Sequence, residues 1–160
     1  TASGGGGTDT FSGFENIDGS NYNDILSGSN GANEIYGSDG NDTINARGGN
    51  DRIEGGRGND VMTGGSGSDT FFFNVDQHNT GVDRITDFDV DRDTIDIRYQ
   101  DGYEPTITMA LGNYNPYAMT FDVILQMNDD AGQSGTIILE DISIADVNDV
   151  MGRIDAHELA

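Results

Sequence analysis

The sequence predicts an all-β protein in two parts: a parallel β-roll over residues 1–72, and a β-rich C-terminal cap with one short helix over residues 73–160. Three observations lead to this fold class. A nine-residue unit repeats from Gly19 to Phe72, each unit carries one apolar residue at a fixed position, and short alternating segments follow the last unit. Because one apolar residue per unit cannot form a core alone, the units must stack.

Six consecutive units align without a gap, and two of their positions are nearly constant. The units read GSNYNDILS, GSNGANEIY, GSDGNDTIN, ARGGNDRIE, GGRGNDVMT and GGSGSDTFF. The sixth position holds Asp24, Asn33, Asp42, Asp51, Asp60 and Asp69. The eighth position holds Leu26, Ile35, Ile44, Ile53, Met62 and Phe71. A flexible linker rich in Gly and Asp would have no reason to keep this register, which therefore favours a folded array.

Two units per turn of a flattened β-helix would place units one apart on opposite edges and units two apart directly above each other. One edge would then carry Asp24, Asp42 and Asp60, and the other would carry Asn33, Asp51 and Asp69. Stacked carboxylates repel one another unless a cation lies between them.

Calcium is the cation that this pattern predicts, since it takes six to eight oxygen ligands from carboxylates and backbone carbonyls. Glycine can adopt positive φ, so glycines in the turns can aim successive carbonyl oxygens into one concavity. We assign this role to Gly37, Gly40, Gly49, Gly55, Gly58 and Gly67. We expect about four or more Ca²⁺ ions between units two apart, with a weaker site at Asn33, whose amide oxygen carries no charge.

The register extends backwards with a defect. Residues 4–12 match the repeat and supply Asp9, whereas Glu15 lies nine residues before Asp24 and could contribute a ligand beside Asn33. Because Asp9 precedes Glu15 by six residues instead of nine, we expect an irregular turn at residues 12–18.

Composition narrows the possible partners. The chain of 160 residues has a formal charge of −22, and all seven of its basic residues are Arg, which argues against binding nucleic acid or an anionic membrane surface. It has no Cys, so a bound metal would have to replace disulfides as the stabilising device of an exported protein. No segment approaches a membrane span, no N-terminal signal peptide is visible, and we expect a monomer.

After residue 72 the repeat stops, and alternating segments predict further strands. We expect them at residues 71–75 (an aromatic strand capping the open end of the roll), 82–88, 93–97, 106–111, 121–127 and 135–139. Val147, Val150, Met151 and Ile154 have the spacing of an amphipathic helix, which Ser143 and Asp146 could cap. This helix would cover the sheet more readily than it would dock on a partner.

An acidic segment at residues 83–93 allows two interpretations. Asp83 and Asp87 could hold an extra calcium ion where the roll meets the second half. Asp89, Asp91 and Asp93 are better explained as a solvated turn between two strands.

Together these motifs resemble the repeats-in-toxin (RTX) family of calcium-binding nonapeptide proteins. Residues 67–73, 82–88 and 93–97 look like the join between an RTX roll and the C-terminal domain of proteins exported by type I secretion, and residues 135–147 are similar to their tails. The resemblance implies a calcium-folded export module, a partnership with the type I secretion machinery, and a location outside or on the surface of a Gram-negative bacterium. The Lys-free, acidic composition and residues 14–20 favour the end of a large adhesin.

An enzyme is not expected from the residues present. His78 and His157 lie in no zinc motif, and there is no Cys nucleophile or G-x-S-x-G motif. One alternative is a carbohydrate-binding module of a polysaccharide-modifying enzyme, or the C-terminal domain of a secreted protease or lipase. The second half could then bind a glycan through Tyr99, Tyr103, Tyr114 and Tyr117, although these tyrosines equally suit plain packing, and the acidity argues against polyuronates.

Overall fold

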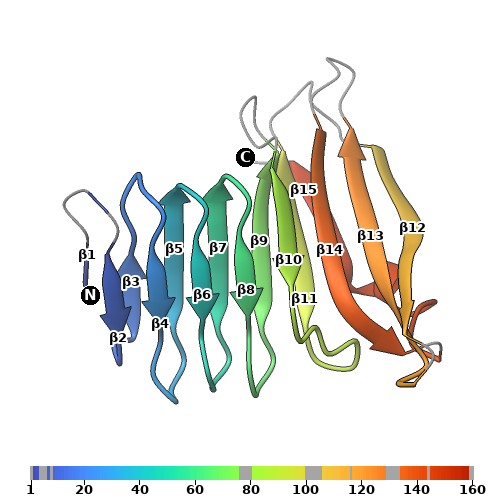
Figure 1. Ribbon diagram of the computed structural model, residues 1–160, viewed down its shortest axis with the longest axis horizontal. Coiled ribbons are helices and arrows are strands. Elements are labelled where there is room, and N and C mark those ends of the chain that lie inside the picture. The colour runs from blue at the N-terminus through green and yellow to red at the C-terminus, as the bar shows by residue number, and fades with distance from the viewer. Residues whose placement is uncertain are drawn as a thin grey trace.

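The computed structural model describes residues 2–3, 7, 9–75, 81–99, 106–115, 117–128, 134–143 and 145–158. In these residues the chain winds back and forth between two β-sheets, which form the two walls of a long, flattened roll (Figure 1). The all-β, parallel β-roll fold predicted from the repeats is confirmed. His78 and Tyr103 lie outside the described residues.

Among the described residues, the first sheet has seven strands, all of them parallel to their neighbours. In spatial order they are β1 (Ala2–Ser3), β3 (Asn16–Asp18), β5 (Glu34–Asp39), β7 (Arg52–Arg57), β9 (Thr70–Val75), β11 (Thr94–Tyr99) and β15 (Ile154–Glu158).

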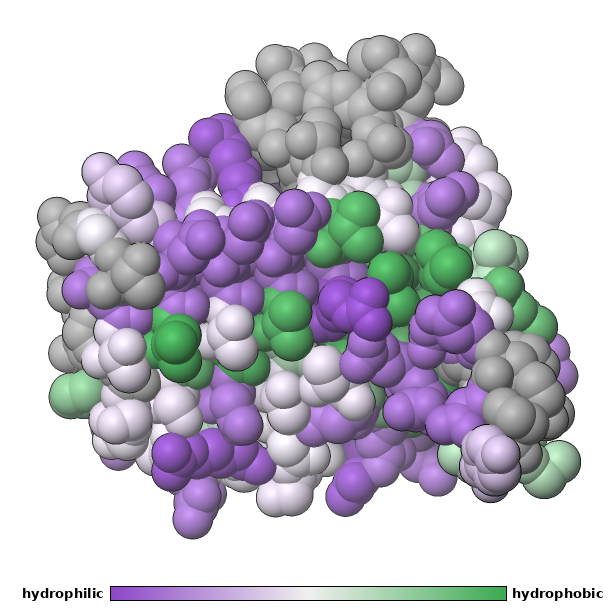
Figure 2. All heavy atoms as spheres, viewed as in Figure 1, coloured by the Kyte–Doolittle hydropathy of each residue, from purple (hydrophilic) through white to green (hydrophobic). Residues whose placement is uncertain are grey.

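The second sheet has eight strands in the part of the chain that the structure describes, and it is parallel except at one end. Its order is β2 (Thr10–Ser12), β4 (Ile25–Ser27), β6 (Thr43–Asn45), β8 (Val61–Thr63), β10 (Val82–Ile85), β14 (Ser134–Ser143), β13 (Thr120–Asn128) and β12 (Thr106–Asn115). Strands β12 and β13 are antiparallel to their neighbours and form the end of the sheet that lies far from the N-terminus (Figure 1). Hydrophobic and hydrophilic residues are interspersed on the face of the molecule seen in Figure 2.

The strand register confirms two repeats per turn. Leu26 pairs with Ile44, and Ile44 pairs with Met62, so equivalent residues of units two apart lie side by side in one sheet. In the short strands β3, β6 and β8 only the central side chain is fully buried, as one apolar residue per unit requires.

The buried side chains form one continuous core that runs through both halves of the chain. It includes the eighth-position residues of all six units, together with Ile17, Ile85, Ile95, Ile97, Val123, Leu125, Met127, Ile137 and Leu139. Strand β9 lies inside the first sheet, between β7 and β11, so the prediction that residues 71–75 cap the end of the roll is wrong. The roll continues because β10 and β11 add to its two sheets as the repeats do.

The prediction of an amphipathic α-helix over residues 147–154 is also wrong. Residues 145–149 form turns, Val150–Arg153 is a single 3₁₀ turn (η1), and Ile154 already belongs to strand β15. Gly152 weakens an α-helix here, and the parallel pairing of Ile154 with Ile95 extends the chain instead. No helix among the described residues is long and apolar enough to cross a membrane.

Candidate calcium sites

Two columns of aspartate side chains, one of which includes an asparagine, follow the edges of the roll, where the chain passes from one sheet to the other. The first column holds Asp9, Asp24, Asp42, Asp60 and Asp83. The second column holds Asn33, Asp51, Asp69 and Asp93. The structure therefore brings the sixth-position residues together as the period predicts, and it extends each column beyond the repeats.

Each column is connected by one recurring hydrogen bond. The backbone N–H of a column residue donates to the Oδ1 atom of the residue one turn further on. The nitrogen–oxygen distance is 2.8 Å from Asp24 to Asp42, 2.8 Å from Asp42 to Asp60, and 3.0 Å from Asp60 to Asp83. One carboxylate oxygen of each accepting aspartate is thus occupied by a hydrogen bond from the backbone of the preceding turn.

Fifth-position asparagines form a second series of bonds that run in the opposite direction along the chain. The Oδ1 atom of Asn23 accepts from the N–H of Asn41, and Asn41 accepts in the same way from Asn59, both at 2.8 Å. Sequence analysis missed these bonds, although Asn at the fifth position of four units was a visible signal.

The other carboxylate oxygen is left without a partner in most of these residues. The Oδ2 atoms of five aspartates are buried and accept no hydrogen bond: Asp9, Asp42, Asp51, Asp60 and Asp69. Four of these side chains, those within the six units, are at most 1% exposed. A buried carboxylate oxygen without a hydrogen-bond partner is costly, so each such atom is suited to bind a cation.

Backbone oxygens approach the same positions. A methyl group added at Gly37 would lie closer than 3.0 Å to both Asp42 Oδ2 and the carbonyl oxygen of Gly55, one turn further on. Additions at Gly55 and Gly64 would likewise meet the Oδ2 atoms of Asp60 and Asp69. At these three positions, a residue without a side chain leaves this space open between the carboxylate and the backbone.

The fourth-position glycines give the turns their shape. Four of them have φ between 122° and 141°, a conformation that residues with a side chain rarely adopt: Gly40, Gly49, Gly58 and Gly67. Each of these turns contains one of the buried carboxylates without a partner, and Gly7 (φ 91°) precedes Asp9 in the same way. The glycines named from the sequence therefore do lie where the turns need them.

Burial raises the pKa of the column carboxylates. Desolvation is the largest cause at every affected site, and it raises the pKa of Asp42 and Asp83 to about 7 and that of Asp60 and Asp69 to about 6. Neighbouring column aspartates add to the shift at Asp42 and Asp69. The sites thus bind a positive charge readily, whether a proton or a metal ion.

These residues fit Ca²⁺. Among the described residues no three acidic or histidine side chains converge on one point, so a bound ion would take few carboxylates and complete its shell with carbonyl oxygens. Calcium accepts that mixture of hard oxygen ligands at variable geometry. The proximity of Asp42 Oδ2 and the Gly55 carbonyl agrees with an ion held between units two apart.

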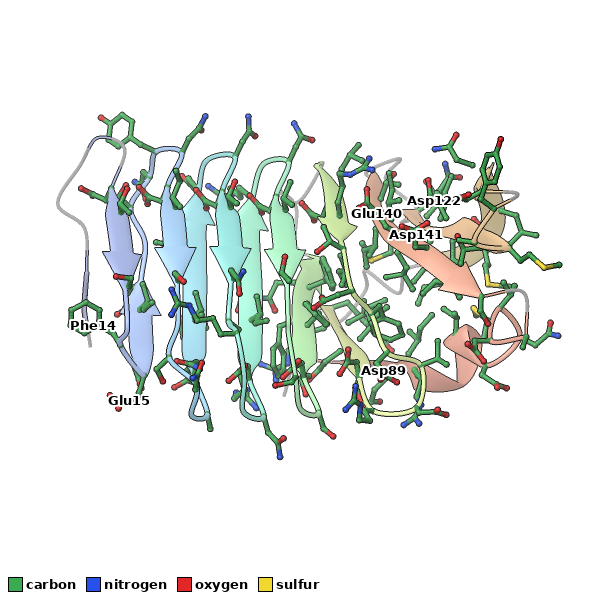
Figure 3. The ribbon with its side chains drawn as sticks, turned by 60° about the horizontal axis from the view of Figure 1, so that its bottom comes forward. Phe14, Glu15, Asp89, Asp122, Glu140 and Asp141 are labelled. Atoms are coloured by element: carbon green, nitrogen blue, oxygen red, sulfur yellow. The ribbon has the colours of Figure 1, made fainter. Side chains whose placement is uncertain are left out.

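Four sequence-predicted residues outside the six units have different positions. Asp9 and Asp83 belong to the first column. The Glu15 side chain is exposed at the end of the roll and does not join a column (Figure 3). Asp87 lies on the opposite edge from Asp83, where it accepts hydrogen bonds from the N–H groups of Gly64 and Gly65, so the expectation that Asp83 and Asp87 share one ion is wrong.

Asp93 was expected in a solvated turn, but it is 3% exposed and completes the second column. The signal that could have identified it is local: Asp93-Thr94-Ile95 repeats the pattern of Asp42-Thr43-Ile44. The connection preceding it is longer than nine residues, which hides it from a search at a fixed period.

Comparison with known families identifies the repeats. The family of RTX calcium-binding nonapeptide repeats (4 copies) matches residues 18–53 and 46–75. The nonapeptide units of this chain are RTX repeats. As RTX repeats they bind Ca²⁺, and the four turns with partnerless carboxylates among the six units fit the expected number of about four ions. Proteins that carry RTX repeats are typically secreted.

Two solved structures resemble this chain over most of its length. Both are subunits of the Azotobacter vinelandii mannuronan C5-epimerase. AlgE6R3 shares 28% identity and a TM-score of 0.59, covering 85% of this chain and 79% of its own. AlgE6R2 shares 26% identity and a TM-score of 0.56, covering 86% of this chain and 90% of its own. The comparison with curated proteins found no match.

Proposed function

We propose that this RTX chain is a calcium-dependent folding and export module of a secreted or surface-attached bacterial protein, an adhesin in our interpretation, which leaves the cell by type I secretion. The observation that supports this most directly is the set of buried Oδ2 atoms without partners along both edges of the roll. Without a cation these carboxylates oppose folding, and with one they connect neighbouring turns. A chain of this kind can stay unfolded where calcium is scarce and fold where it is abundant.

The concentrations on the two sides of a cell envelope suit such a switch. Calcium modules outside cells bind with dissociation constants of about 10⁻⁴ to 10⁻³ M. At 1 mM calcium, a site with a constant of about 10⁻⁴ M adds about 1.4 kcal/mol of stability, so four sites would add roughly 5 to 6 kcal/mol. That sum is about the whole stability of a small domain, and it vanishes at submicromolar calcium.

Calcium-dependent folding would also favour export. An unfolded chain can pass through a narrow channel, and folding upon emergence would oppose its return. The formal charge of −22 adds repulsion that keeps the metal-free chain expanded, and bound calcium would offset part of it.

Circular dichroism with EDTA, with 1 mM calcium and with 1 mM magnesium tests this proposal. We expect calcium to raise the β signal and the melting temperature well above their values in EDTA, and magnesium to raise them little, since magnesium demands a stricter geometry and keeps its water. A roll that shows the same β signal and melting temperature in EDTA would refute the switch.

A second candidate function is saccharide binding on the outer face of the first sheet. A pocket of about 250 Å³ there is lined by Tyr36, Ser38, Asp39, Glu54, Gly56, Arg57, Phe72, Phe73 and Asn74. Beside it, the guanidinium groups of Arg52 and Arg98 lie 4.2 and 4.3 Å from the centre of the Phe72 ring. Aromatic, acidic and amide groups in one hollow suit sugar hydroxyls, and both similar structures come from an enzyme that acts on mannuronan.

The charges of this face make it the weaker candidate. Arg52 pairs with Glu34, Arg57 with Asp39, and Arg98 with Asp96, so a polyuronate would have to displace these carboxylates. Of the tyrosines suggested from the sequence, Tyr117 is 98% exposed in the turn between β12 and β13 and lines no part of the pocket. Titration of calcium-loaded protein with mannuronan oligomers would detect binding, and the absence of heat or chemical-shift change would remove this candidate.

A further inference from the structure

Two of the six turns differ from the others. In the turns at residues 19–24 and 28–33, neither the second nor the fourth position has positive φ, whereas both do in the four later turns. The sixth-position side chains also differ, because both have hydrogen-bond partners for both of their polar atoms. In the first of these turns, Asp24 Oδ2 accepts from the backbone N–H and the hydroxyl of Ser20, at 2.6 and 3.0 Å.

The Asn33 side chain has more polar neighbours than that of Asp24, since its nitrogen lies among oxygens of two successive turns. Within its own turn, Nδ2 is within hydrogen-bond reach of the carbonyl oxygens of Gly31 and Ser29. From the turn one level on, it is 3.4 Å from the Ala46 carbonyl oxygen and 3.0 Å from Asp51 Oδ1. Two carbonyls of one turn, a carbonyl of the next and a carboxylate oxygen are the kind of shell that a cation between the turns would take.

The orientation of this amide is set by its other atom. Asn33 Oδ1 accepts the backbone N–H of Ser29 at 2.9 Å. A rotation that exchanged the two atoms would place an N–H₂ group against that N–H and an amide oxygen against the carbonyls. Both contacts would be repulsive, so the nitrogen is the atom that faces the oxygens.

We propose that the Asn33 amide takes the place of a calcium ion, so that the contact between turns 28–33 and 46–51 closes without metal. An amide nitrogen has no lone pair available for a metal ion, and its two N–H donors are shared among the four oxygens. The second column therefore contains one calcium-independent contact at its N-terminal end. Asp51 keeps its own Oδ2 free for the contact with turn 64–69.

This inference differs from the expectation of a weak calcium ligand at Asn33. A weak ligand would leave an ion of low affinity in place, whereas the amide leaves no room for one. The inference relies on calcium binding by the neighbouring turns, which supplies the reference count against which Asn33 is judged.

The test exchanges the amide for a carboxylate. Asn33→Asp restores an acceptor where the nitrogen lies, and Asn30→Asp adds the same charge to an exposed position of the same turn. Calcium stoichiometry is measured by equilibrium dialysis and calorimetric titration of the whole chain, and melting is followed in EDTA and in 1 mM calcium. We expect Asn33→Asp to bind one more calcium ion per chain than the unmodified chain, to melt lower in EDTA, and to gain more from calcium. Asn30→Asp should bind the unmodified number.

Asn33→Ala separates the two roles of the residue. If the amide replaces the ion, this variant melts lower but binds the same number of calcium ions. A count lower by one in Asn33→Ala, or no added ion in Asn33→Asp, would overturn the proposal while leaving the calcium switch intact. If the unmodified chain bound no calcium at all, both this inference and the proposed function would fail.

Discussion

Asp60 offers the sharpest test of whether the column carboxylates bind calcium, because its two carboxylate oxygens have different roles. Its side chain is fully buried, Oδ1 accepts the N–H of Asp42 at 2.8 Å, and Oδ2 has no partner beside Gly55. Asp60→Asn keeps the first oxygen and removes the charge that binds a metal ion. Asp60→Ala removes both.

The expected magnitudes follow from these two tasks. Loss of one site with a dissociation constant of about 10⁻⁴ M lowers the stability by about 1.4 kcal/mol at 1 mM calcium. In Asp60→Ala the buried N–H of Asp42 also loses its acceptor, which costs a further ~1 to 3 kcal/mol. Since 1 kcal/mol shifts the melting temperature by roughly 2 to 4 °C at this chain length, Asp60→Asn should lose about 3 to 6 °C with calcium, and Asp60→Ala more.

Without calcium the order of the variants changes. In EDTA the neutral amide of Asp60→Asn no longer buries an unpaired charge, so this variant should melt higher than the unmodified chain, whereas Asp60→Ala should melt lower. Differential scanning calorimetry of the unmodified chain and the two variants in EDTA and in 1 mM calcium measures these six melting temperatures, and Asp18→Asn, at an exposed position, controls for net charge. If Asp60→Asn gained as much from calcium as the unmodified chain does, Oδ2 would not be a ligand and the column argument would be refuted.

Two further predictions concern turn shape and pH. In Gly58→Ala a methyl group would lie against the Gly40 carbonyl at a backbone φ of 127°, which should lower the free energy of unfolding, measured with denaturant, by ~1 to 3 kcal/mol. In Gly31→Ala the nearest atom to the added methyl group would be 3.7 Å away, so the loss of stability should be smaller. Equal losses would contradict the assigned turn shape. The folded-state pKa values of Asp42 (about 7) and Asp60 (about 6) are raised, so protonation of these carboxyls favours the metal-free fold. The stability of that fold should be greatest at acid pH and fall as pH rises through 6 to 7, while calcium affinity rises over the same range. Chemical denaturation in EDTA and calcium titration between pH 5 and 8 measure both, and a metal-free fold that is more stable at pH 8 than at pH 5 would contradict this prediction.

The repeats made the first half of the fold predictable. A constant period fixes which residues share an edge, so the positions of Asp42 and Asp60 followed from counting alone, and the structure pairs their turns at a separation of 18 residues. The second half breaks the period: Asp83 follows Asp60 by 23 residues and Asp93 follows Asp69 by 24. Longer connections between the same Asp-x-apolar triplets keep the columns but hide them from a search at a fixed spacing.

Other features depended on contacts that no pattern contains. Residues 147–154 have the apolar spacing of a helix, but Ile154 pairs with Ile95 at the edge of the first sheet, and the chain forms a strand from there on. The direction of the Asn33 amide is likewise set by Ser29 and by a carbonyl one turn away. A sequence shows that position 33 lacks a carboxylate, but not that a nitrogen takes the place of the ion.

The second column also shows where calcium is needed along the roll. At its far end, Asp93 Oδ2 accepts the N–H of Asp89 at 2.9 Å, and Arg92 pairs with Asp89, so the bend that contains Asp89 is closed by protein groups alone (Figure 3). At its near end Asn33 closes its own contact.

In the second column, among the residues that the structure describes, only Asp51 and Asp69 have buried carboxylate oxygens without a hydrogen-bond partner. On this edge, metal-dependent turns therefore lie between two turns that the chain closes by itself. Calcium on this edge would join two segments that already have their local shape, which lowers the conformational entropy that each bound ion must offset.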